Sequence, residues 1–325
     1  MISYRGVMRN MGKWRLRFSM LGTVALIIGF STLGFAALMS WMGSFNLFTL
    51  VMLVSIFNLG QWLLGPYLIN RLYKVREVDD GESWLLRSVE ELSRRSGIKT
   101  PKLMISGLSI PNAFAYGSPL MGSHVSVTEG LLKELDSEEV EAVIGHELGH
   151  LRHRDTQVMM FVSLLPSIFF ILARSFMYSS MYDRRRRSSG AAIIGVASLV
   201  IYFVLNLFTL GLSRLREYYA DQHSVSVVED GARKLSEGLA KITIASGRMQ
   251  GESLGGSGVS GFKTLFISDP DKAQKDAAAL LRSRYTSDDE LVDSIARQRV
   301  TGLERVLELF STHPDIRKRL QALKN

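Results

Sequence analysis

The stretch AVIGHELGHLRHRD, residues 142–155, places His146 and His150 four positions apart, with Glu147 directly after the first histidine. On an α-helix, residues at i and i+4 lie on one face, about 6 Å apart, so two imidazoles in this pattern can share one metal ion. The alternative is a polar helix face whose histidines are satisfied by ordinary hydrogen bonds. The rest of the sequence has to decide between these two interpretations.

The residue types in this stretch favour a hydrolytic metal site. Two histidine ligands, with a glutamate general base beside the first, form the HExxH arrangement of metallopeptidases. The apolar run at 142–144 predicts a buried helix. Gly149 leaves space for a substrate or another helix to come close, although a glycine inside a helix costs about 1 kcal/mol. We therefore predict that His146 and His150 bind zinc, one ion per chain, and that Glu147 activates water.

A catalytic zinc ion needs a third protein ligand and one open position. The chain has no cysteine, so this ligand must be a histidine or a carboxylate. Glu217, in REYYAD at 216–221, is the better candidate, and His153 is the weaker one because its position continues around the helix. Asp221, one turn after Glu217, is placed to accept the second ring N–H of a ligand histidine and fix its tautomer. An ordinary solvated helix face is the alternative for both carboxylates.

Two uncharged segments near the N-terminus predict a membrane hairpin. Residues 18–42 carry no charge and are long enough to span a hydrocarbon core of about 30 Å as a helix, and residues 44–66 form a second such run. A cleaved signal peptide is the alternative, but its apolar core would be only about 7–15 residues long. Basic residues flank the hairpin on both sides, so the positive-inside rule places both ends in the cytoplasm. These residues are Arg5, Arg9, Lys13, Arg15 and Arg17 before it and Arg71, Lys74 and Arg76 after it.

Two further apolar segments lie between the predicted metal ligands. Residues 156–173 form the third run, interrupted by Pro166, and residues 191–212 form the fourth. Since both ends of this pair lead to ligands of one ion, the two runs cross the membrane together or not at all. Crossing would put the basic run 184–187 on the outer side, against the positive-inside rule, but the first hairpin usually dominates orientation. We therefore predict four spans.

Short strands and helices are expected in the more polar parts of the chain. The segments KLMIS, NAFAYG and HVSVTEG, broken by Gly, Pro and Ser, are typical of strands. DDGESWLLRSVEELSRRSG is typical of a helix that stops at Gly97, and a second helix is expected from Ser137, as its N-cap, to residue 155. The three strand segments are 102–106, 112–117 and 124–130, and the first helix segment is 79–97.

The predicted fold class is therefore a mainly α integral membrane protein with a zincin-like catalytic domain, which contains a small β-sheet and the HExxH helix. The N-terminal membrane hairpin is placed at 1–66 and the first part of a cytoplasmic catalytic domain at 67–155. The second apolar hairpin is placed at 156–212. The second part of the catalytic domain, with the third ligand and C-terminal helices, is placed at 213–325.

Composition and charge support a membrane partner. The chain is 46% hydrophobic and carries a formal charge of +8. These properties fit together if apolar segments lie in lipid and basic residues lie beside anionic headgroups. No recognisable nucleic-acid-binding module accompanies the charge, so no nucleic-acid partner is expected. The lack of cysteine excludes a disulfide framework and a thiol nucleophile.

Several segments, in this order, resemble the HtpX-type integral-membrane zinc metalloproteases, part of the wider group that includes the CAAX prenyl proteases. The resemblance covers most of the chain. It implies an ATP-independent endopeptidase that cuts misfolded or damaged membrane proteins, in protein quality control and stress response, from the cytoplasmic side of the cell membrane. Its ligand pattern implies His146, His150 and Glu217 as zinc ligands and Glu147 as the base. It rests on the N-terminal hairpin, PNAFAYG at 111–117, HVSVTEGLL at 124–132, HELGH at 146–150, REYYAD at 216–221 and STHPDIRKRL at 311–320.

The resemblance also suggests roles outside the ligand set. NAFAYG is similar to the edge strand that lines the cleft of such proteases, to which an extended substrate adds as a further strand. Asn112, Ala113 and Phe114 are then substrate-binding residues, with a plain structural strand as the alternative. His313 is either a hydrogen-bond donor to the oxyanion or a local helix cap. Either of two arginines, Arg317 or Arg319, is placed to pair with Asp221 and orient it.

Two other functions stay open at this point. A CAAX-type prenyl-protein protease would be expected to have more spans around a large intramembrane chamber. A non-catalytic membrane scaffold with a structural metal would normally fill the position that a catalytic site leaves open.

Overall fold

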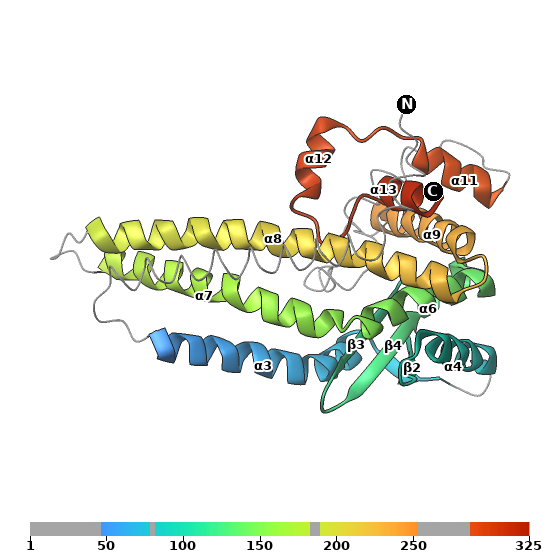
Figure 1. Ribbon diagram of the computed structural model, residues 1–325, viewed down its shortest axis with the longest axis horizontal. Coiled ribbons are helices and arrows are strands. Elements are labelled where there is room, and N and C mark those ends of the chain that lie inside the picture. Colours follow the sequence, from blue (N-terminus) through green and yellow to red (C-terminus); the bar gives the residue numbers. More distant parts are fainter. Residues whose placement is uncertain (1–46, 79–81, 183–188, 253–286, 325) are drawn as a thin grey trace. The chain divides into compact units, whose positions relative to one another are not determined.

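The computed structural model describes residues 47–78, 82–182, 189–252 and 287–324 (Figure 1). The predicted span at 18–42 lies outside the described residues.

The chain divides into two compact units. The first unit comprises Met1–Gly12, Leu64–Thr156 and Arg214–Asn325, and the second comprises Lys13–Leu63 and Gln157–Ser213. All predicted site residues belong to the first unit.

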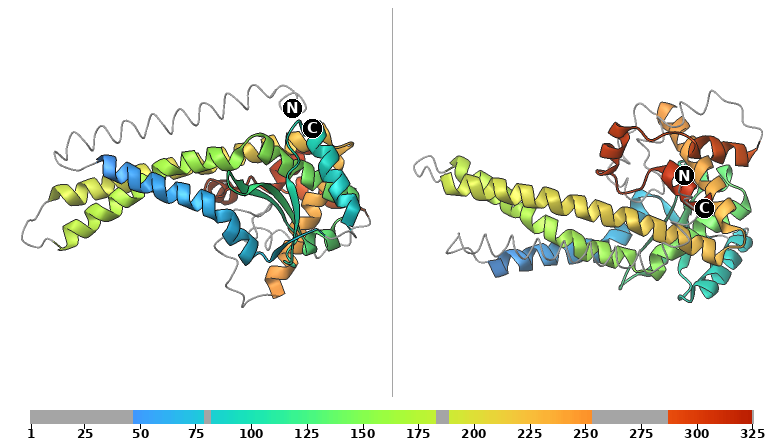
Figure 2. Two further views of the ribbon diagram at one scale, coloured as in Figure 1. Left: turned by 90° about the horizontal axis from the view of Figure 1, so that it is seen from below. Right: turned by 45° about the horizontal axis from the view of Figure 1, so that its top comes forward.

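The first unit contains a four-stranded mixed sheet, visible edge-on in Figure 2. Its strands are β1 (Val75–Glu77), β2 (Lys102–Ser106), β3 (Ala113–Ser118) and β4 (Gly122–Thr128). Their order is β1-β2-β4-β3, with β2 and β4 parallel and the other two pairs antiparallel. Strand β3 is therefore an edge strand, and one row of its backbone groups is directed away from β4.

The three predicted strands are confirmed: 102–106 has the predicted ends, and the ends of the other two differ by one or two residues. HVSVTEG stops being a strand at Thr128, because Thr128 Oγ1 accepts a hydrogen bond from the Leu131 N–H (3.1 Å) and caps helix α5 (Glu129–Glu134). Side-chain capping of this kind competes with strand pairing, and here it turns the chain.

The predicted helix at 79–97 is found as α4 (Ser83–Ser96), and Gly97 ends it with φ 64°, a left-handed conformation that glycine adopts easily. The HExxH helix is α6 (Ser137–Arg152). Ser137 is not its N-cap as predicted, because Asp136 holds the extended cap conformation and its N–H donates to Glu139 Oε2 (2.9 Å).

The HExxH helix also ends earlier than predicted. Arg154 adopts φ 53°, which interrupts the helix, and α7 (Asp155–Tyr182) begins directly after it. Helix α7 runs through Pro166, where the sequence predicted an interruption.

The remaining helices of the first unit surround α6. Helix α6 packs against α4, α9 and strand β3, and α9 in turn packs against α11 and α13. The residues that fill this core alternate along the strands and recur at helical spacing; they include Leu92, Ile105, Val127, Ile144 and Leu148. The further helices are α8 (Ser189–Val227, which ends in this unit), α9 (Gly231–Glu252), α11 (Asp288–Ala296), α12 (Gly302–Glu308) and α13 (Ile316–Lys324).

Two glycines on one face of α6 allow α8 to come very close. A Cβ placed on Gly149 would lie 3.0 Å from Ala220 Cα and 3.0 Å from His223 Cβ. A Cβ on Gly145 would lie 2.9 Å from Val228 Cγ2. Of the two uses predicted for the space at Gly149, substrate or helix, the structure therefore shows the helix.

The second unit contains most of α7, the first part of α8 and part of α3 (Leu47–Leu72). Ile168, Phe169 and Leu172 of α7 share an apolar core with Leu205 and Leu212 of α8. Within the described residues, one helix, Gly190–Val227, is long and apolar enough to cross a membrane, and Gln157–Phe170 is a shorter apolar helix. The predicted total of four spans stays a prediction.

We expect Gly149→Ala to weaken both thermal stability and metal binding. The added methyl group would gain about 1 kcal/mol in helix propensity. However, its contact with the α8 backbone would push the two helices apart. Melting temperature and zinc affinity of the purified full chain measure this. Gly302→Ala is the control, because nothing lies within 4 Å of its added Cβ. Wild-type zinc affinity in Gly149→Ala would contradict the requirement for close contact.

Candidate metal centre

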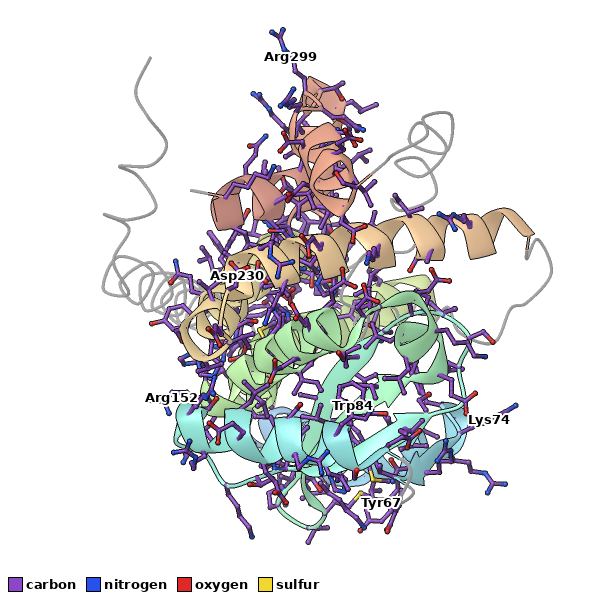
Figure 3. The ribbon with its side chains drawn as sticks, turned by 90° about the vertical axis from the view of Figure 1, so that its right-hand side faces the viewer. Tyr67, Lys74, Trp84, Arg152, Asp230 and Arg299 are labelled. Atoms are coloured by element: carbon purple, nitrogen blue, oxygen red, sulfur yellow. The ribbon has the colours of Figure 1, made fainter. Side chains whose placement is uncertain are left out.

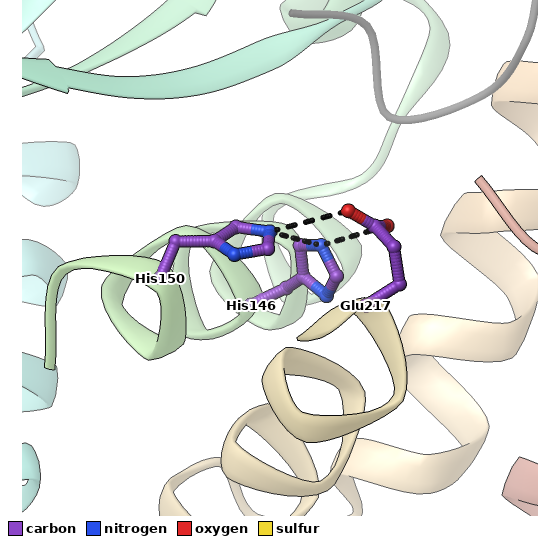
Figure 4. Close-up of side chains that lie close together, drawn as sticks. All are labelled: His146, His150 and Glu217. Atoms are coloured by element: carbon purple, nitrogen blue, oxygen red, sulfur yellow. Dashed lines mark hydrogen bonds and ion pairs between the residues drawn. The ribbon is translucent and has the colours of Figure 1, made fainter. Parts of the chain in front are cut away.

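Three side chains from two helices converge in the first unit (Figure 4). His146 Nε2 lies 3.2 Å from His150 Nε2, and both atoms face the carboxylate of Glu217. Glu217 Oε2 is 3.7 Å from His146 Nε2, and Glu217 Oε1 is 3.6 Å from His150 Nε2. Helix α6 supplies the histidines one turn apart, and the close approach of α8 supplies the carboxylate.

The spacing of these atoms fits one tetrahedral metal ion. Ligand atoms at the usual zinc–nitrogen distance of about 2.0–2.1 Å stand roughly 3.3 Å apart at the corners of a tetrahedron. The 3.2 Å between the two Nε2 atoms and the 3.6 Å from His150 Nε2 to Glu217 Oε1 are close to that value, and the other carboxylate oxygen, Oε2, lies 3.7 Å from His146 Nε2. Two imidazoles and one carboxylate are also a donor set that catalytic zinc sites use. The three residues therefore fit the predicted zinc site.

Burial of the centre is uneven. His146 and Glu217 are nearly inaccessible, with 1% and 7% of their side chains exposed, whereas 20% of the His150 side chain is exposed. Solvent or a substrate can therefore approach from the side of His150. A catalytic metal needs such an approach for its open position.

Glu147 connects the metal centre to the edge strand of the sheet. Its side chain is buried, and Glu147 Oε2 accepts a hydrogen bond from the Ala115 N–H of β3 at 2.8 Å. Burial raises the pKa of the Glu147 carboxyl, and the neighbouring imidazoles of His150 and His146 act in the opposite direction. The carboxyl thus lies where the histidine pair and the edge strand meet.

A buried ion-pair network orients the first histidine. His146 Nδ1 lies 2.9 Å from Asp221 Oδ1. Arg319, which is 1% exposed, holds Asp221 with two hydrogen bonds of 2.9 and 2.6 Å. Its Nη1 also lies 3.2 Å from Glu217 Oε2. Of the two arginines suggested by the sequence, Arg319 therefore pairs with Asp221, while Arg317 pairs with Asp315.

A second carboxylate orients the other histidine, and sequence reasoning missed it. Asp155 Oδ2 lies 2.6 Å from His150 Nδ1, and Asp155 Oδ1 pairs with Arg216. Arg216 also donates to the His153 carbonyl (3.1 Å). Asp155 can turn back toward His150 because Arg154 breaks the helix between them. Asp155 itself, at the end of HELGHLRHRD, was the only sequence signal for this contact. The helix predicted to continue to residue 155 would have directed its side chain away from His150.

His313 lies beside the third ligand. Its Nδ1 is 3.3 Å from Glu217 Oε2, and the residue is 8% exposed. Both ring nitrogens, Nδ1 and Nε2, are buried and make no hydrogen bond to the described residues. An unpaired polar atom in the interior is costly, so a substrate group that paired with it would be stabilised.

The predicted substrate-binding residues lie at the start of the edge strand, with buried side chains. Asn112 is 0% exposed; its carbonyl accepts a hydrogen bond from the Thr128 N–H, and its own N–H donates to Thr128 Oγ1. Ala113 faces the main core, and Phe114 packs against Tyr73 at 5.3 Å between ring centroids. A bound substrate strand would therefore meet the backbone of β3 rather than these side chains.

His153 is not part of the ligand group found among the described residues. It caps the end of α6, and its ring meets Tyr219 edge-on, with 4.5 Å between centroids. Burial, followed by the neighbouring His223, lowers the pKa of His153 to about 4. Its surroundings are those of a packed histidine.

A second acidic group, Asp136, Glu139 and Asp288, also has closely spaced oxygens. The ammonium group of Lys241 already lies among them, at 3.2, 2.8 and 3.0 Å from the three carboxylates in that order. A lysine side chain therefore already occupies the space among these carboxylates. It ties the start of α6 to α9 and α11.

The histidine pair on one helix, the buried glutamate beside it and the carboxylate from a second helix together define a metal centre of the metallopeptidase type. A model of peptidase family M48 matches residues 80–325. The chain belongs to this family of metallopeptidases, and its resemblance to the HtpX group is borne out by relatives described as protease HtpX homologues.

Two of these relatives come from archaea. The chain is 37% identical over 313 residues to the protease HtpX homologue of Aeropyrum pernix, covering 94% of each chain. It is 35% identical over 323 residues to that of Archaeoglobus fulgidus, covering 98% of this chain and 89% of the relative. The crystal structure of S. mikatae Ste24p shares the fold, with a TM-score of 0.55 and 18% identity over 96% of this chain and 66% of that one.

We expect Asp155→Asn to bind zinc about 10–100-fold more weakly than wild type, because His150 loses the carboxylate that orients it. Competition with a chelator measures this affinity. Asp230→Asn is the matched control, since Asp230, labelled in Figure 3, is an exposed aspartate that forms an ion pair with Arg233. Equal affinity in all three proteins would remove Asp155 from this role.

Proposed function

We propose that the protein is a zinc-dependent endopeptidase of the cell membrane that hydrolyses peptide bonds of misfolded or damaged membrane proteins at the cytoplasmic face. One observation carries the proposal: Glu147 lies next to the convergent histidine pair and at the same time contacts the edge strand at Ala115. Metal ligands, a base and a surface for an extended peptide are thus gathered in one place.

The proposed zinc ligands are His146, His150 and Glu217. Glu217 Oε2 is already engaged by Arg319 and His313, which leaves Oε1 as the oxygen available to the metal. When bound, zinc supplies Lewis-acid activation of water and of the peptide carbonyl. Asp221 and Asp155 keep the two imidazoles in the orientation and tautomer that metal binding requires.

Glu147 is the proposed general base. It takes a proton from the attacking water and then delivers that proton to the amine of the departing peptide. Its burial supports this role, because the raised pKa of a buried carboxyl makes it a stronger base than an exposed one. The Ala115 N–H holds the carboxylate in place before substrate arrives.

His313 is proposed to stabilise the developing oxyanion. His313 Nδ1 faces Glu217 Oε2 at 3.3 Å, so Nε2 is the ring nitrogen left to donate a hydrogen bond to the substrate oxygen. Nε2 has neither a hydrogen bond nor an ion pair among the described residues, whereas Nδ1 faces Glu217, which supports this assignment.

Strand β3 supports the acceptance of unrelated sequences. Because Ala115 donates to Glu147 rather than to β4, alternation along the strand directs the backbone groups of Ala113 and Gly117 to the same outer side. An extended substrate can pair with these groups through its main chain, which every sequence offers. Unfolded segments, which have free backbone groups, are the substrates that this favours.

A membrane location is supported by helix α8. Its residues 189–213 are uncharged, and Glu217 follows residue 213 by four positions, about 6 Å along the helix axis. If the uncharged part spans the bilayer, the metal lies close to the surface. The multi-pass arrangement with cytoplasmic N-terminus and catalytic unit follows from the basic residues that flank the first predicted hairpin.

The test is cleavage of an unfolded model protein by zinc-loaded full-length enzyme. We expect Glu147→Gln to keep its zinc and lose activity by about 10²–10⁴-fold, the usual contribution of general acid–base catalysis. Glu141→Gln, on the same helix, is the control and should cleave like wild type. Undiminished cleavage by Glu147→Gln would remove Glu147 as the base.

The same preparation separates the alternatives. Cleavage restricted to a prenylated CAAX peptide would replace the proposed substrate class by the prenyl-protein class. Zinc bound at one per chain, with neither substrate cleaved, would favour a scaffold with a structural metal.

A further inference from the structure

Helix α12 exposes an apolar face in the C-terminal part of the first unit. Leu303, Val306 and Leu307 of α12, with Phe310 in the turn after it, follow the i, i+3, i+4, i+7 spacing of one helical face. Their exposed fractions are 70%, 53%, 46% and 52%, and the neighbouring Leu309 is 49% exposed. In a globular domain such a face normally points to the core, so its exposure requires an explanation.

The polar face of the same helix is the one that attaches it to the protein. Glu304 Oε2 lies 3.2 Å from Arg317 Nη1 of α13. Glu308 is buried, pairs with Lys318 and accepts a hydrogen bond from the Asp315 N–H (3.1 Å). The helix is therefore amphipathic with its polar side inward and its apolar side outward. Specific contacts hold it this way round.

The C-terminal end of α12 is hydrogen-bonded to Arg214 of α8. Arg214 is the first charged residue after the uncharged stretch 189–213. Its Nη1 donates to the carbonyls of Glu308, Leu309 and Ser311, at 2.9, 3.2 and 2.7 Å. The exposed apolar face is thus anchored one residue beyond the end of the apolar run of α8.

The geometry points to α12 as an interfacial helix whose apolar face enters the headgroup region of the bilayer that α8 crosses. Two further exposed cations suit an anionic lipid surface: Arg305 in α12, and Arg299, which precedes the helix and points outward in Figure 3. A lipid surface fits better than a protein partner, because the anchor Arg214 fixes the face beside the proposed exit of α8 from the membrane. The inference rests on the proposed membrane location.

The helix also leads into the metal centre. Residues 309–313 join α12 to His313, and α13 then supplies Arg319. Seating α12 in the bilayer would therefore hold the C-terminal side of the centre at a fixed height relative to the membrane surface, where segments of membrane proteins emerge.

Fluorescence quenching of the full-length protein in vesicles tests this placement. The chain has no cysteine, so Val306→Cys and Phe310→Cys each give one site for an environment-sensitive fluorophore. The vesicles contain equal parts of phosphatidylcholine and phosphatidylglycerol, with or without brominated acyl chains, and iodide is the aqueous quencher. Val200→Cys in the apolar run of α8 reports on the proposed span. Arg94→Cys, on the exposed side of α4, reports on water.

We expect the labels at Val306 and Phe310 to lose fluorescence with brominated lipid, as at Val200, and to be protected from iodide relative to Arg94. Labels at α12 that respond to iodide and not to lipid, while Val200 responds to lipid, would overturn the inference alone. Protection of α12 from both quenchers would mean that another protein segment or a second copy covers it, which also overturns it. A lack of lipid quenching at Val200 as well would overturn the proposed membrane location.

Discussion

The metal centre depends on how closely helices α6 and α8 approach each other. Gly149 and Gly145 carry no side chain where α8 and the residue after it lie closest, and Glu217 lies about one turn before Ala220, which faces Gly149. Each glycine weakens its own helix by about 1 kcal/mol. A wider helix pair would carry the carboxylate away from the histidines, and three ligands could no longer reach one ion. The HELGH sequence thus supplies two histidines and a glutamate, and its glycine leaves the space that lets Glu217 of α8 reach them.

Charge inside the first unit is organised around these ligands. Two buried arginines, Arg319 and Arg216, each hold an aspartate that faces Nδ1 of one of the two proposed ligand histidines. Removing one partner from such a pair leaves an uncompensated buried charge, which is strongly destabilising. Because Arg319 comes from the last helix and Arg216 from α8, the centre is complete only when segments far apart in the sequence have folded together.

Much of the fold could be predicted because local signals agree with it. The strands, the helix that ends at Gly97 and the buried HExxH helix follow from alternation, helical spacing and one left-handed glycine. The features that could not be predicted depend on the backbone conformation of single residues, or on which of two similar side chains forms a contact in the folded chain. The left-handed Arg154 gives Asp155 its contact with His150, and only the folded chain distinguishes Arg319 from its neighbour two positions earlier. Likewise, the sequence of α12 shows that the helix is amphipathic but not that its polar face is the one that packs against the protein.

The most direct test of the central claim is zinc X-ray absorption spectroscopy of the purified full-length protein, combined with its zinc content. The account predicts one zinc per chain, bound to two imidazole nitrogens and one carboxylate oxygen, with a further oxygen from water. Loss of the carboxylate contribution in Glu217→Ala, together with weaker binding, would support the assignment. A spectrum with three imidazoles, or a Glu217→Ala variant that keeps the wild-type spectrum and zinc content, would contradict it.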